Sequence, residues 1–404
     1  MLFEHVDNFE SGVNIKVIGV GGGGNNAVNR MISSSIIGVD FVGINTDRQA
    51  LKKSESPTQI VIGEKITKGF GAGSNPEIGA RAAEESLEEI KNVLEGTDMV
   101  FITAGMGGGT GTGAAPVVAH AAHDMGILTV AIVTKPFAFE GKRRMEQAEA
   151  GIKELRQFVD SLVIIPNEKL KEVSETRITI ANAFEIADDV LRRGVQSVSD
   201  LINKEGYVNL DFADVTSVMK DAGYAHMGMG VGTGKDKAIM AAQQAIASPL
   251  FETSMKGAKG VLVNICMSPD VGLEDIDEAS NFITSQASED ANVIWGALFD
   301  ETLEDEVRIT IIATGFDKKE EMKPAPAATA SVKPVEQPAQ PSVRPVEAPK
   351  PQSAPPAAVL HPVTPAPKPQ PKPQPKPQPA APKKKETDYD LDQFLKTYDN
   401  DRRR

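Results

Sequence analysis

The sequence has 404 residues, of which 40% are apolar and 25% are charged, with a formal net charge of −13 and a single cysteine. This length predicts about two folded units, while one cysteine excludes a disulfide framework and favours a reducing compartment. There is no run of about 18 apolar residues that predicts a membrane-spanning helix, and no secretion signal precedes the first strand. We therefore expect a cytoplasmic protein.

The charge is divided unevenly along the chain. Residues 1–316 hold 27 Lys and Arg against 45 Asp and Glu, a net charge of −18, whereas residues 317–404 have a net charge of +5. An acidic body excludes nucleic acid as the expected partner, because phosphate backbones are recognised by basic surfaces. The basic tail can still contact anionic surfaces.

A glycine-rich loop follows the first predicted strand, 15–20. It has the spacing G-x-G-x-x-G, formed by Gly19, Gly21 and Gly24. In dinucleotide-binding folds this spacing places a helix N-terminus against phosphates, and an acid after the next strand binds the ribose. Here the predicted strand 41–45 ends near Asp47. The pattern is therefore consistent with an NAD-dependent oxidoreductase, which we keep as an alternative.

A second glycine loop follows the predicted strand 98–104. Residues 105–113 contain six glycines in nine positions and lead into a predicted helix. Such a turn presents backbone N–H groups and a positive helix N-terminus, which together bind phosphate. Two such loops on separate strands favour one nucleotide held from two sides. The P-loop motif is excluded near Gly234, because Met229 replaces its first glycine and Asp236 its hydroxyl residue.

The predicted elements alternate up to residue 165, which indicates βαβ units and a parallel sheet with helices on both faces. The expected strands are 15–20, 41–45, 98–104, 128–134 and 161–165, and the expected helices are 25–33, 76–95, 114–125 and 142–159. The segment 178–203 has apolar residues at mostly helical spacing and predicts a long helix that connects two domains. The second unit is predicted to be a smaller α/β domain with a mixed sheet. Its expected strands are 226–232, 260–267, 293–298 and 306–314, and its expected helices are 236–247 and 273–287.

The composition changes after residue 316. Residues 324–382 hold 20 of the 27 prolines and no Phe, Tyr or Trp, which predicts a disordered tether with polyproline II character. The last residues regain apolar side chains at helical spacing, at Leu391, Phe394, Leu395 and Tyr398. So short a helix is marginal alone, so we expect it to fold on a partner, with a frayed, solvated tail as the alternative.

Four motifs of this chain resemble those of the FtsZ family, the tubulin-like GTPases of bacterial cell division. They are Gly107 to Gly113, Gly21 to Asn26, Asn45 to Asp47 and Asn209 to Asp214. The resemblance runs from about residue 13 to 316, and the proline-rich linker with its terminal peptide repeats the family's layout. It implies a tubulin-like α/β fold with a parallel-sheet nucleotide-binding domain, a long central helix, a smaller α/β domain with a mixed sheet and a disordered C-terminal tail.

The resemblance also implies the domain boundaries. They are an N-terminal extension (1–12), a GTP-binding domain (13–177), a central connecting helix (178–205), a C-terminal α/β domain with the catalytic loop (206–316), a disordered proline-rich linker (317–385) and a docking peptide (386–404).

The resemblance further implies which residues bind GTP or GDP. The nucleotide would be lined by Gly22, Gly23, Gly24, Asn25 and Asn26, with Gly109, Thr110 and Gly111 at the phosphates, Ala72 and Gly73 in the loop that senses the γ-phosphate, and Glu140, Arg144 and Asn167 near the ribose and phosphates. Phe184 would stack on the base, and Asp188 would accept hydrogen bonds from guanine N1–H and N2–H. Adenine lacks that donor pair, so the carboxylate selects GTP. From the residues alone, a surface salt bridge for Glu140 and Arg144 and helix packing for Phe184 remain open.

In the family, the residues matching Asn209, Asp211 and Asp214 complete the active site of the adjacent subunit. Such a head-to-tail contact does not close and generates filaments. From the residues alone, Asp211 and Asp214 fit better as N-cap residues of a helix over 212–223, and both roles can coexist. Mg²⁺ is expected with the triphosphate, although no acidic Walker-type ligand for it is visible.

The implied function is a GTPase that polymerises into filaments of the cytokinetic ring at the mid-cell division site, with hydrolysis coupled to filament turnover. Membrane-tethering and regulatory division proteins would bind the terminal peptide through Leu391, Phe394 and Leu395, without insertion of this chain into the membrane. The peptide resembles the family pattern D-I-P-x-F-L-R but lacks its proline. Two alternatives remain: the oxidoreductase, and a nucleotide-binding scaffold that polymerises without useful hydrolysis.

Overall fold

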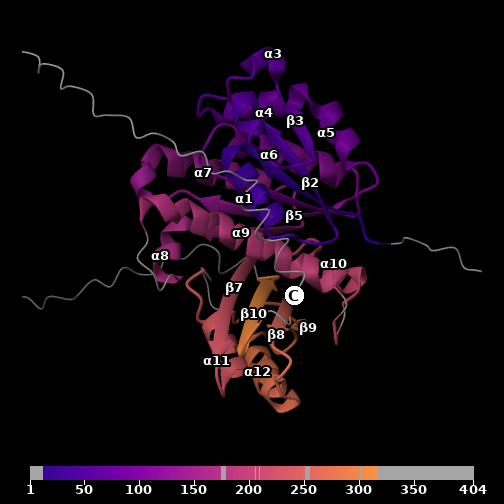
Figure 1. The fold of residues 1–404 in the computed structure, drawn as a ribbon. Coiled ribbons are helices and arrows are strands. Elements are labelled where there is room, and N and C mark those ends of the chain that lie inside the picture. The colour runs from indigo at the N-terminus through magenta and orange to yellow at the C-terminus, as the bar shows by residue number, and fades with distance from the viewer. Residues whose placement is uncertain are drawn as a thin grey trace, which may run out of the picture. The chain divides into compact units, whose positions relative to one another are not determined.

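A computed structural model describes residues 12–173, 179–204, 206–208, 210–250, 255–300 and 303–316. Within these residues, ten strands form one sheet in the order β3-β2-β1-β4-β5-β6-β7-β10-β8-β9 (Figure 1). The strands are β1 (Ile15–Val20), β2 (Val39–Asn45), β3 (Thr58–Val61), β4 (Met99–Gly105), β5 (Leu128–Lys135), β6 (Ser161–Pro166), β7 (Gly223–Thr233), β8 (Gly260–Met267), β9 (Asn292–Phe299) and β10 (Glu306–Thr314).

The first six strands are parallel in every pairing. Their carboxyl ends therefore lie at one edge of the sheet, which we call the carboxyl edge, and their starts lie at the amino edge. β1 is paired with β2 on one side and with β4 on the other, so the direction of strand order reverses at β1. In open α/β sheets a crevice forms at this reversal, and ligands bind there at the carboxyl edge.

Helices cover both faces of the parallel sheet, as predicted. The first face packs against α4 (Pro76–Glu85), α5 (Leu87–Leu94), α6 (Thr110–Asp124) and α7 (Lys142–Leu155), and the second against α1 (Gly21–Ser33), α9 (Ile180–Asn203) and α10 (Phe212–Met219). Successive strand residues point to opposite faces. Val17 and Ile18 of β1, both buried, accordingly belong to different cores.

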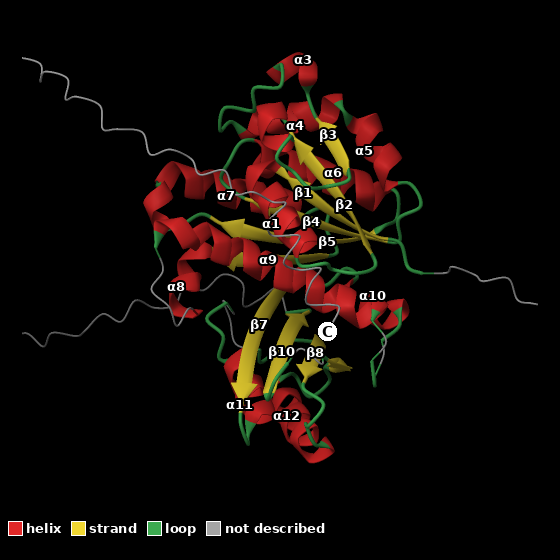
Figure 2. Ribbon diagram, viewed as in Figure 1, coloured by secondary structure: helices red, strands yellow, loops and turns green. Residues whose placement is uncertain are grey.

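The C-terminal part has the predicted mixed sheet. β10 is antiparallel to β7 and to β8, whereas β8 and β9 are parallel. The helices α11 (Lys237–Ile246) and α12 (Leu273–Gln286) pack on this sheet around a third core (Figure 2). β7 also pairs with β6 over Ser161–Val163, so the sheet is continuous between the two parts.

The predicted connecting helix is α9, which lies between the two parts (Figure 1). Thr179 caps its start by accepting a hydrogen bond from the Asn182 N–H at 3.3 Å. Its buried residues share one core with β1, β4, β5 and β6 and also with Leu262 of β8 and Ile312 of β10. With 24 residues, α9 is about 36 Å long.

Several element boundaries differ from the sequence prediction. α1 begins at Gly21 rather than residue 25, and α6 begins at Thr110 rather than 114, because the glycines of both loops form the first helical turns. The predicted helix 76–95 is interrupted at Ser86. Strand β3 and the short elements were not predicted, namely α2 (Arg48–Leu51), α3 (Glu64–Thr67), η1 (Ala138–Glu140), η2 (Asn167–Lys169) and α8 (Leu170–Val173). The predicted linker and terminal peptide lie outside the described residues.

Candidate functional site

The two glycine loops meet at the reversal point of the carboxyl edge. A Cβ placed on Gly21 would lie 2.8 Å from the backbone N of Gly111, and one on Gly23 would lie 3.3 Å from the Cα of Gly105. Only glycine allows backbones to approach this closely. Sites next to these contacts are open, since a Cβ on Gly22 or Gly108 would have no heavy atom within 4 Å. Open space therefore lies beside the backbone of both loops.

Asn25 stabilises the conformation of the first glycine loop through hydrogen bonds from its side-chain amide. Its amide nitrogen lies 3.1 Å from the carbonyl oxygen of Gly19, 2.7 Å from that of Gly21 and 3.0 Å from that of Ile44. The side chain is buried, and its Oδ1 has no hydrogen-bond partner among the described residues. The structure thus gives Asn25 an architectural contact in addition to its predicted place at the nucleotide, while its neighbour Asn26 is exposed.

Side chains tie the second loop to its neighbours. The hydroxyls of Thr110 and Thr46 are 2.6 Å apart, which connects the start of α6 to the end of β2. A Cβ on Gly109 would lie 2.9 Å from the Cβ of Ala72, so the loop that contains Ala72 and Gly73 lies directly beside the second glycine loop. These contacts bring most of the predicted phosphate-binding residues into one cradle.

The interpretation as a dinucleotide-binding fold depended on Asp47, but the carboxylate of this residue binds backbone N–H groups of the protein. Its carboxylate caps α2 by accepting hydrogen bonds from the N–H groups of Gln49 and Ala50, at 2.8 Å and 3.0 Å. This cap accounts for an acid after β2 without any ribose.

Glu140 and Arg144 lie beside the same loop. The Glu140 carboxylate is largely buried, accepts a hydrogen bond from the Phe137 N–H at 2.8 Å and forms an ion pair with Arg144 at 3.1 Å. A Cβ on Gly107 would lie 2.6 Å from the Arg144 carbonyl oxygen, so this glycine allows α7 to approach. The predicted salt bridge is therefore present, and it stands at the rim of the cradle.

Asn167 occupies the end of β6, where η2 begins. The residue is 4% exposed, and its Oδ1 has no hydrogen-bond partner among the described residues. Buried polar atoms are nearly always hydrogen-bonded, to protein, to ordered water or to a bound group. This observation agrees with the predicted ribose contact.

Three aromatic rings, those of Phe137, Phe139 and Phe184, are in contact near the start of α9. Phe184 is 43% exposed, and its ring meets those of Phe137 and Phe139 edge-on, with centroids 5.6 Å and 6.3 Å away. Phe137 is buried and anchors the other two rings. The predicted packing role of Phe184 and an exposed ring face for stacking are thus both present. Sequence reasoning missed Phe137 and Phe139, which the pattern Phe-Ala-Phe-Glu before a helix could have indicated.

Asp188 lies one helical turn after Phe184. It lines a pocket of about 490 Å³ together with Asn26, Arg30 and other residues of α1. The pKa of Asp188 is raised from its usual value to about 7. Burial is the largest cause of this rise, while the nearby Arg30 lowers the pKa and Glu185 raises it. A carboxyl that titrates near neutral pH inside a pocket is typical of a functional site.

The predicted catalytic acids lie on the other side of the molecule. Asp211 is the N-cap of α10, and Asp214 is its third residue. α10 packs at the amino edge, because Ser161 at the start of β6 donates a hydrogen bond to the Met219 carbonyl at 2.6 Å, and Asp160 accepts one from the Asp221 N–H. Asn209 falls outside the described residues, as do Leu391, Phe394 and Leu395.

Two family models match this chain: "Tubulin/FtsZ family, GTPase domain" over residues 14–175 and "FtsZ family, C-terminal domain" over residues 223–317. The structure of an FtsZ dimer from M. jannaschii has 45% sequence identity and a TM-score of 0.73, covering 76% of this chain and 89% of that chain. The chain belongs to the FtsZ family. A point mutant of FtsZ from the same organism matches with 44% identity and a TM-score of 0.73, over 76% of this chain and 92% of that one.

A more distant match indicates how widely the fold extends. CetZ2 of Haloferax volcanii, solved as a GTPγS-bound protofilament, has 20% identity and a TM-score of 0.66, over 76% of this chain and 94% of that chain. At this identity the likeness shows a shared fold only.

FtsZ membership confirms the predicted fold class, a tubulin-like α/β protein with an N-terminal GTPase domain and a C-terminal FtsZ domain. It also excludes the oxidoreductase alternative. In the described part of this FtsZ-family chain, no helix is both long and apolar enough to cross a bilayer. The same residues contain no group of three or more His, Cys, Asp and Glu side chains placed to hold a metal ion.

Proposed function

We propose that this chain is a GTPase that assembles head-to-tail and hydrolyses GTP only where two copies meet. The observation that carries the proposal is the separation of the two half-sites. The nucleotide cradle lies at the carboxyl edge of the sheet, while Asp211 and Asp214 lie on α10 at the amino edge. FtsZ membership supplies the GTPase domain that this arrangement serves.

The separation is too large for one copy to close. β4 and β5 have 7 and 8 residues, which corresponds to a length of about 25 Å between the edges. A carboxylate must lie within hydrogen-bond reach of the attacking water, either directly or through one more water. Asp211 and Asp214 therefore act on the nucleotide of a neighbouring copy whose carboxyl edge faces this amino edge. This contact joins unlike surfaces, so it generates a filament.

The proposed chemistry divides between the two copies. One copy binds the phosphates through backbone N–H groups of Gly22, Gly109 and Gly111 and holds guanine with Phe184 and Asp188. The other copy supplies carboxylates that orient water in line with the γ-phosphate, which is the main requirement in phosphoryl transfer.

Mg²⁺ is expected with GTP, but the described residues offer no carboxylate cluster for it. The ion would therefore be bound mainly by the triphosphate oxygens.

We also propose that filaments form the division ring and that the terminal peptide, residues 386–404, attaches them to membrane-tethering proteins. Family membership and the apolar residues Leu391, Phe394 and Leu395 support this part.

The GTPase rate per molecule, measured across a range of protein concentrations, tests the proposal. We expect the rate to rise steeply above a threshold and to vanish below it, with light scattering rising at the same concentration. A specific activity that stays constant on dilution would contradict hydrolysis between copies. Scattering that rises without phosphate release would instead favour the scaffold that polymerises without useful hydrolysis.

A further inference from the structure

We propose that Asp160 is a positioning residue for hydrolysis, which holds the C-terminal end of α10 so that Asp211 and Asp214 face the nucleotide of the next copy. The inference rests on the proposed function and adds a residue that lies outside the four family motifs. Asp160 does not contact the nucleotide in this assignment, because it acts through α10.

Asp160 lies directly before β6 and is held by the start of β5. Its carboxylate oxygen Oδ2 accepts a hydrogen bond from the Thr129 N–H at 2.8 Å, and its own N–H donates to the Thr129 carbonyl at 2.8 Å. The residue is buried. The carboxylate of Asp160 therefore has a fixed position at the amino edge of the GTPase domain.

The second carboxylate oxygen of Asp160 holds the turn that follows α10. Oδ1 accepts a hydrogen bond from the Asp221 N–H at 3.2 Å, and the Asp160 carbonyl accepts one from the Gly223 N–H at 2.8 Å. Asp221 has a φ of 52°, in the left-handed region that is unfavourable for residues other than glycine. Such a conformation persists only where the surrounding structure holds it, and Asp160 supplies two of the contacts that do so.

The last carbonyls of α10 are bound from two sides. Ser161 of β6 donates a hydrogen bond to the Met219 carbonyl at 2.6 Å, and Thr314 of β10 donates one to the Val218 carbonyl at 2.9 Å. Carbonyls at the end of a helix lack partners within that helix, so these contacts fix its direction. The fixed end of α10 is the end next to Asp160, whereas the two acids lie at its start.

A small movement at the fixed end becomes large at the acids. The eight residues of α10 span about 12 Å, so a tilt of about 5° moves the start of the helix by about 1 Å. A displacement of about 1 Å of a catalytic group can lower a rate about 100-fold. The hydrogen bonds at Asp160 are therefore sufficient to control the rate without any contact with the substrate.

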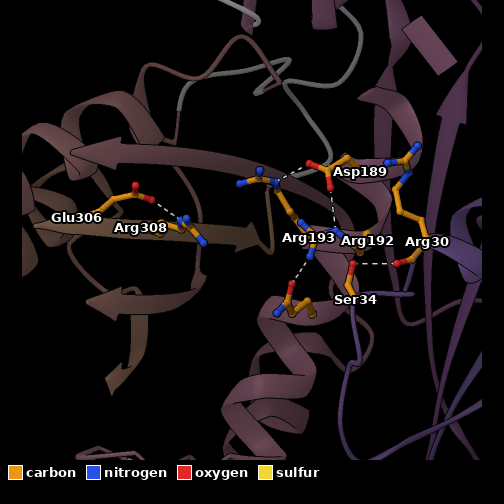
Figure 3. Close-up of polar contacts among 8 residues, drawn as sticks. Arg30, Ser34, Asp189, Arg192, Arg193, Glu306 and Arg308 are labelled. Carbon is orange, nitrogen blue, oxygen red and sulfur yellow. Dashed lines mark hydrogen bonds and ion pairs between the residues drawn. The ribbon is translucent and has the colours of Figure 1, made fainter. Parts of the chain in front are cut away.

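Charged side chains along α9 make a different kind of contact. Arg192 donates to the Asp189 carboxylate within α9, and Arg308 pairs with Glu306 within β10 (Figure 3). These contacts stabilise each element separately and do not join one element to another. Asp160 instead joins the start of β5, the start of β6 and the turn after α10, which is the arrangement that a positioning residue requires.

The variant Asp160→Asn separates these contacts with almost no change in size. Each carboxylate oxygen accepts one backbone N–H, but asparagine has a single acceptor, and its amino group would oppose the other donor. Whichever contact is lost, the link between β5 and the turn is broken. Ser161→Ala removes the contact with the Met219 carbonyl and applies the same test at this junction if Asp160→Asn does not fold.

The control for a general loss of stability is Ile283→Val. Ile283 is a buried residue of α12 in the third core, whose described residues include none of α10. In the full chain, Asp160→Asn should bind GTP as the wild type does below the assembly threshold and sediment at the same protein concentration. Its GTPase rate at saturating GTP should fall about 10- to 100-fold. Ile283→Val should keep the wild-type rate.

Mixing with Asp214→Asn shows which side of the contact Asp160 serves. Asp214→Asn keeps its nucleotide cradle but lacks one catalytic carboxylate. Because each head-to-tail contact pairs one cradle with one set of acids, about a quarter of the contacts in an equal mixture join an Asp214→Asn cradle to the acids of an Asp160→Asn copy. If Asp160 positions the acids, these contacts stay slow, and the mixture is no more active than its two components.

Recovery of the mixture to about a quarter of the wild-type rate would overturn the proposal, because the acids of the Asp160→Asn copy would then be competent. A wild-type rate in Asp160→Asn alone would overturn it as well, and so would a loss of GTP affinity that accounts for the loss of rate. A wild-type specific activity that stays constant on dilution would instead refute hydrolysis between copies, so the two failures are distinguishable.

Discussion

Asp211 and Asp214 cap the same helix by binding each other's backbone. The Asp211 carboxylate accepts a hydrogen bond from the Asp214 N–H at 2.8 Å, and the Asp214 carboxylate accepts one from the Asp211 N–H at 3.2 Å. This reciprocal arrangement is a capping box, and it fixes both side chains before any partner arrives. Each contact occupies one carboxylate oxygen, so the second oxygen of each acid remains available for water.

The capping box allows the structural and catalytic roles of Asp214 to be separated. Asp214→Asn keeps an oxygen that can accept from the Asp211 N–H but removes the charge. We expect Asp214→Asn to bind GTP and unfold like the wild type, while its GTPase rate falls by at least 100-fold. Asp214→Ala should lose the rate and also about 1 kcal/mol of stability, because the hydrogen bond from the Asp211 N–H to the Asp214 carboxylate is lost.

Mixing provides a check on the same residue. Added to wild-type protein, Asp214→Asn should depress the GTPase rate by more than its share of the total, since every contact that it completes is inactive. Normal turnover by Asp214→Asn alone would contradict a catalytic role and leave Asp214 as a cap only.

The pKa of Asp188 predicts a pH dependence of GTP binding. Guanine requires the carboxylate form, and burial places the pKa of Asp188 at about 7. The GTP affinity should therefore be nearly constant above pH 8 and fall about tenfold for each pH unit below 7. Asp188→Asn should bind GTP weakly at every pH without this slope. A flat wild-type profile between pH 6 and 8, measured by equilibrium binding, would contradict the role of Asp188.

The stability of the nucleotide-free protein should respond to Asp188 in the opposite direction. Its pKa is higher in the folded state than the value of 3.8 for an unburied carboxyl. The contribution of this group is therefore most favourable at low pH and is lost as the pH rises from about 4 to 7. Asp188→Asn should remove that loss, which urea unfolding at pH 5 and pH 8 can measure.

Adjacent asparagines should differ sharply in their effect on stability. Asn25→Ala leaves three loop and strand carbonyls without their donor inside the fold, so we expect a loss of about 2–4 kcal/mol in the free energy of unfolding. Asn26→Ala removes an exposed side chain and should change stability by less than about 0.5 kcal/mol. Urea unfolding without nucleotide measures both, and similar losses would refute the structural role of Asn25.

Glycines of the cradle should divide in the same way. Gly113→Ala would place a Cβ 1.9 Å from the Pro76 carbonyl oxygen, so this variant should fold poorly. Gly22→Ala points into open space, so the fold should be retained. If that space holds the nucleotide, Gly22→Ala should weaken GTP binding by more than tenfold. Unchanged GTP affinity in Gly22→Ala would move the phosphates elsewhere.

The terminal peptide gives a prediction independent of the nucleotide. Deletion of residues 386–404 should leave GTP turnover and filament formation intact but abolish recruitment to vesicles that carry the tethering partner. Phe394→Ala should cause most of the same loss, because apolar anchors dominate such contacts. If the deletion also prevents assembly, as judged by sedimentation, the peptide belongs to the filament itself.

The sequence predicted the order and type of the long elements because their apolar spacing is regular. The strands of β1 and β8 match to the residue, and α9 differs only at its start. The predicted starts of α1 and α6 lie four residues too far along the chain, because both helices begin inside glycine runs. Glycine has low helix propensity, so the sequence favoured loops there. β3 was missed because it has only four residues, two of them polar.

A single sequence does not give the distances between residues that are far apart along the chain, and this limited the prediction of the site. Motifs identified the glycine loops, but Phe137 and Phe139 belong to none of these motifs, and only their ring contacts with Phe184 bring them to the candidate site. Asp211 is the N-cap that the sequence favoured, and Asp214 contributes as its partner at the third position. That these acids lie at the far edge of the sheet could not be read from sequence, because it depends on the direction in which α9 crosses the molecule.

The opposite placement of cradle and acids has a consequence for any assembly built from this chain. All subunits would point the same way, and the two ends would be chemically unlike. At one end the last subunit would expose its nucleotide with no neighbour to hydrolyse it, and at the other end the acids would have no substrate. The terminal GTP would thus be the longest-lived in the filament, and the geometry of a single sheet would give the polymer a direction and a protected end.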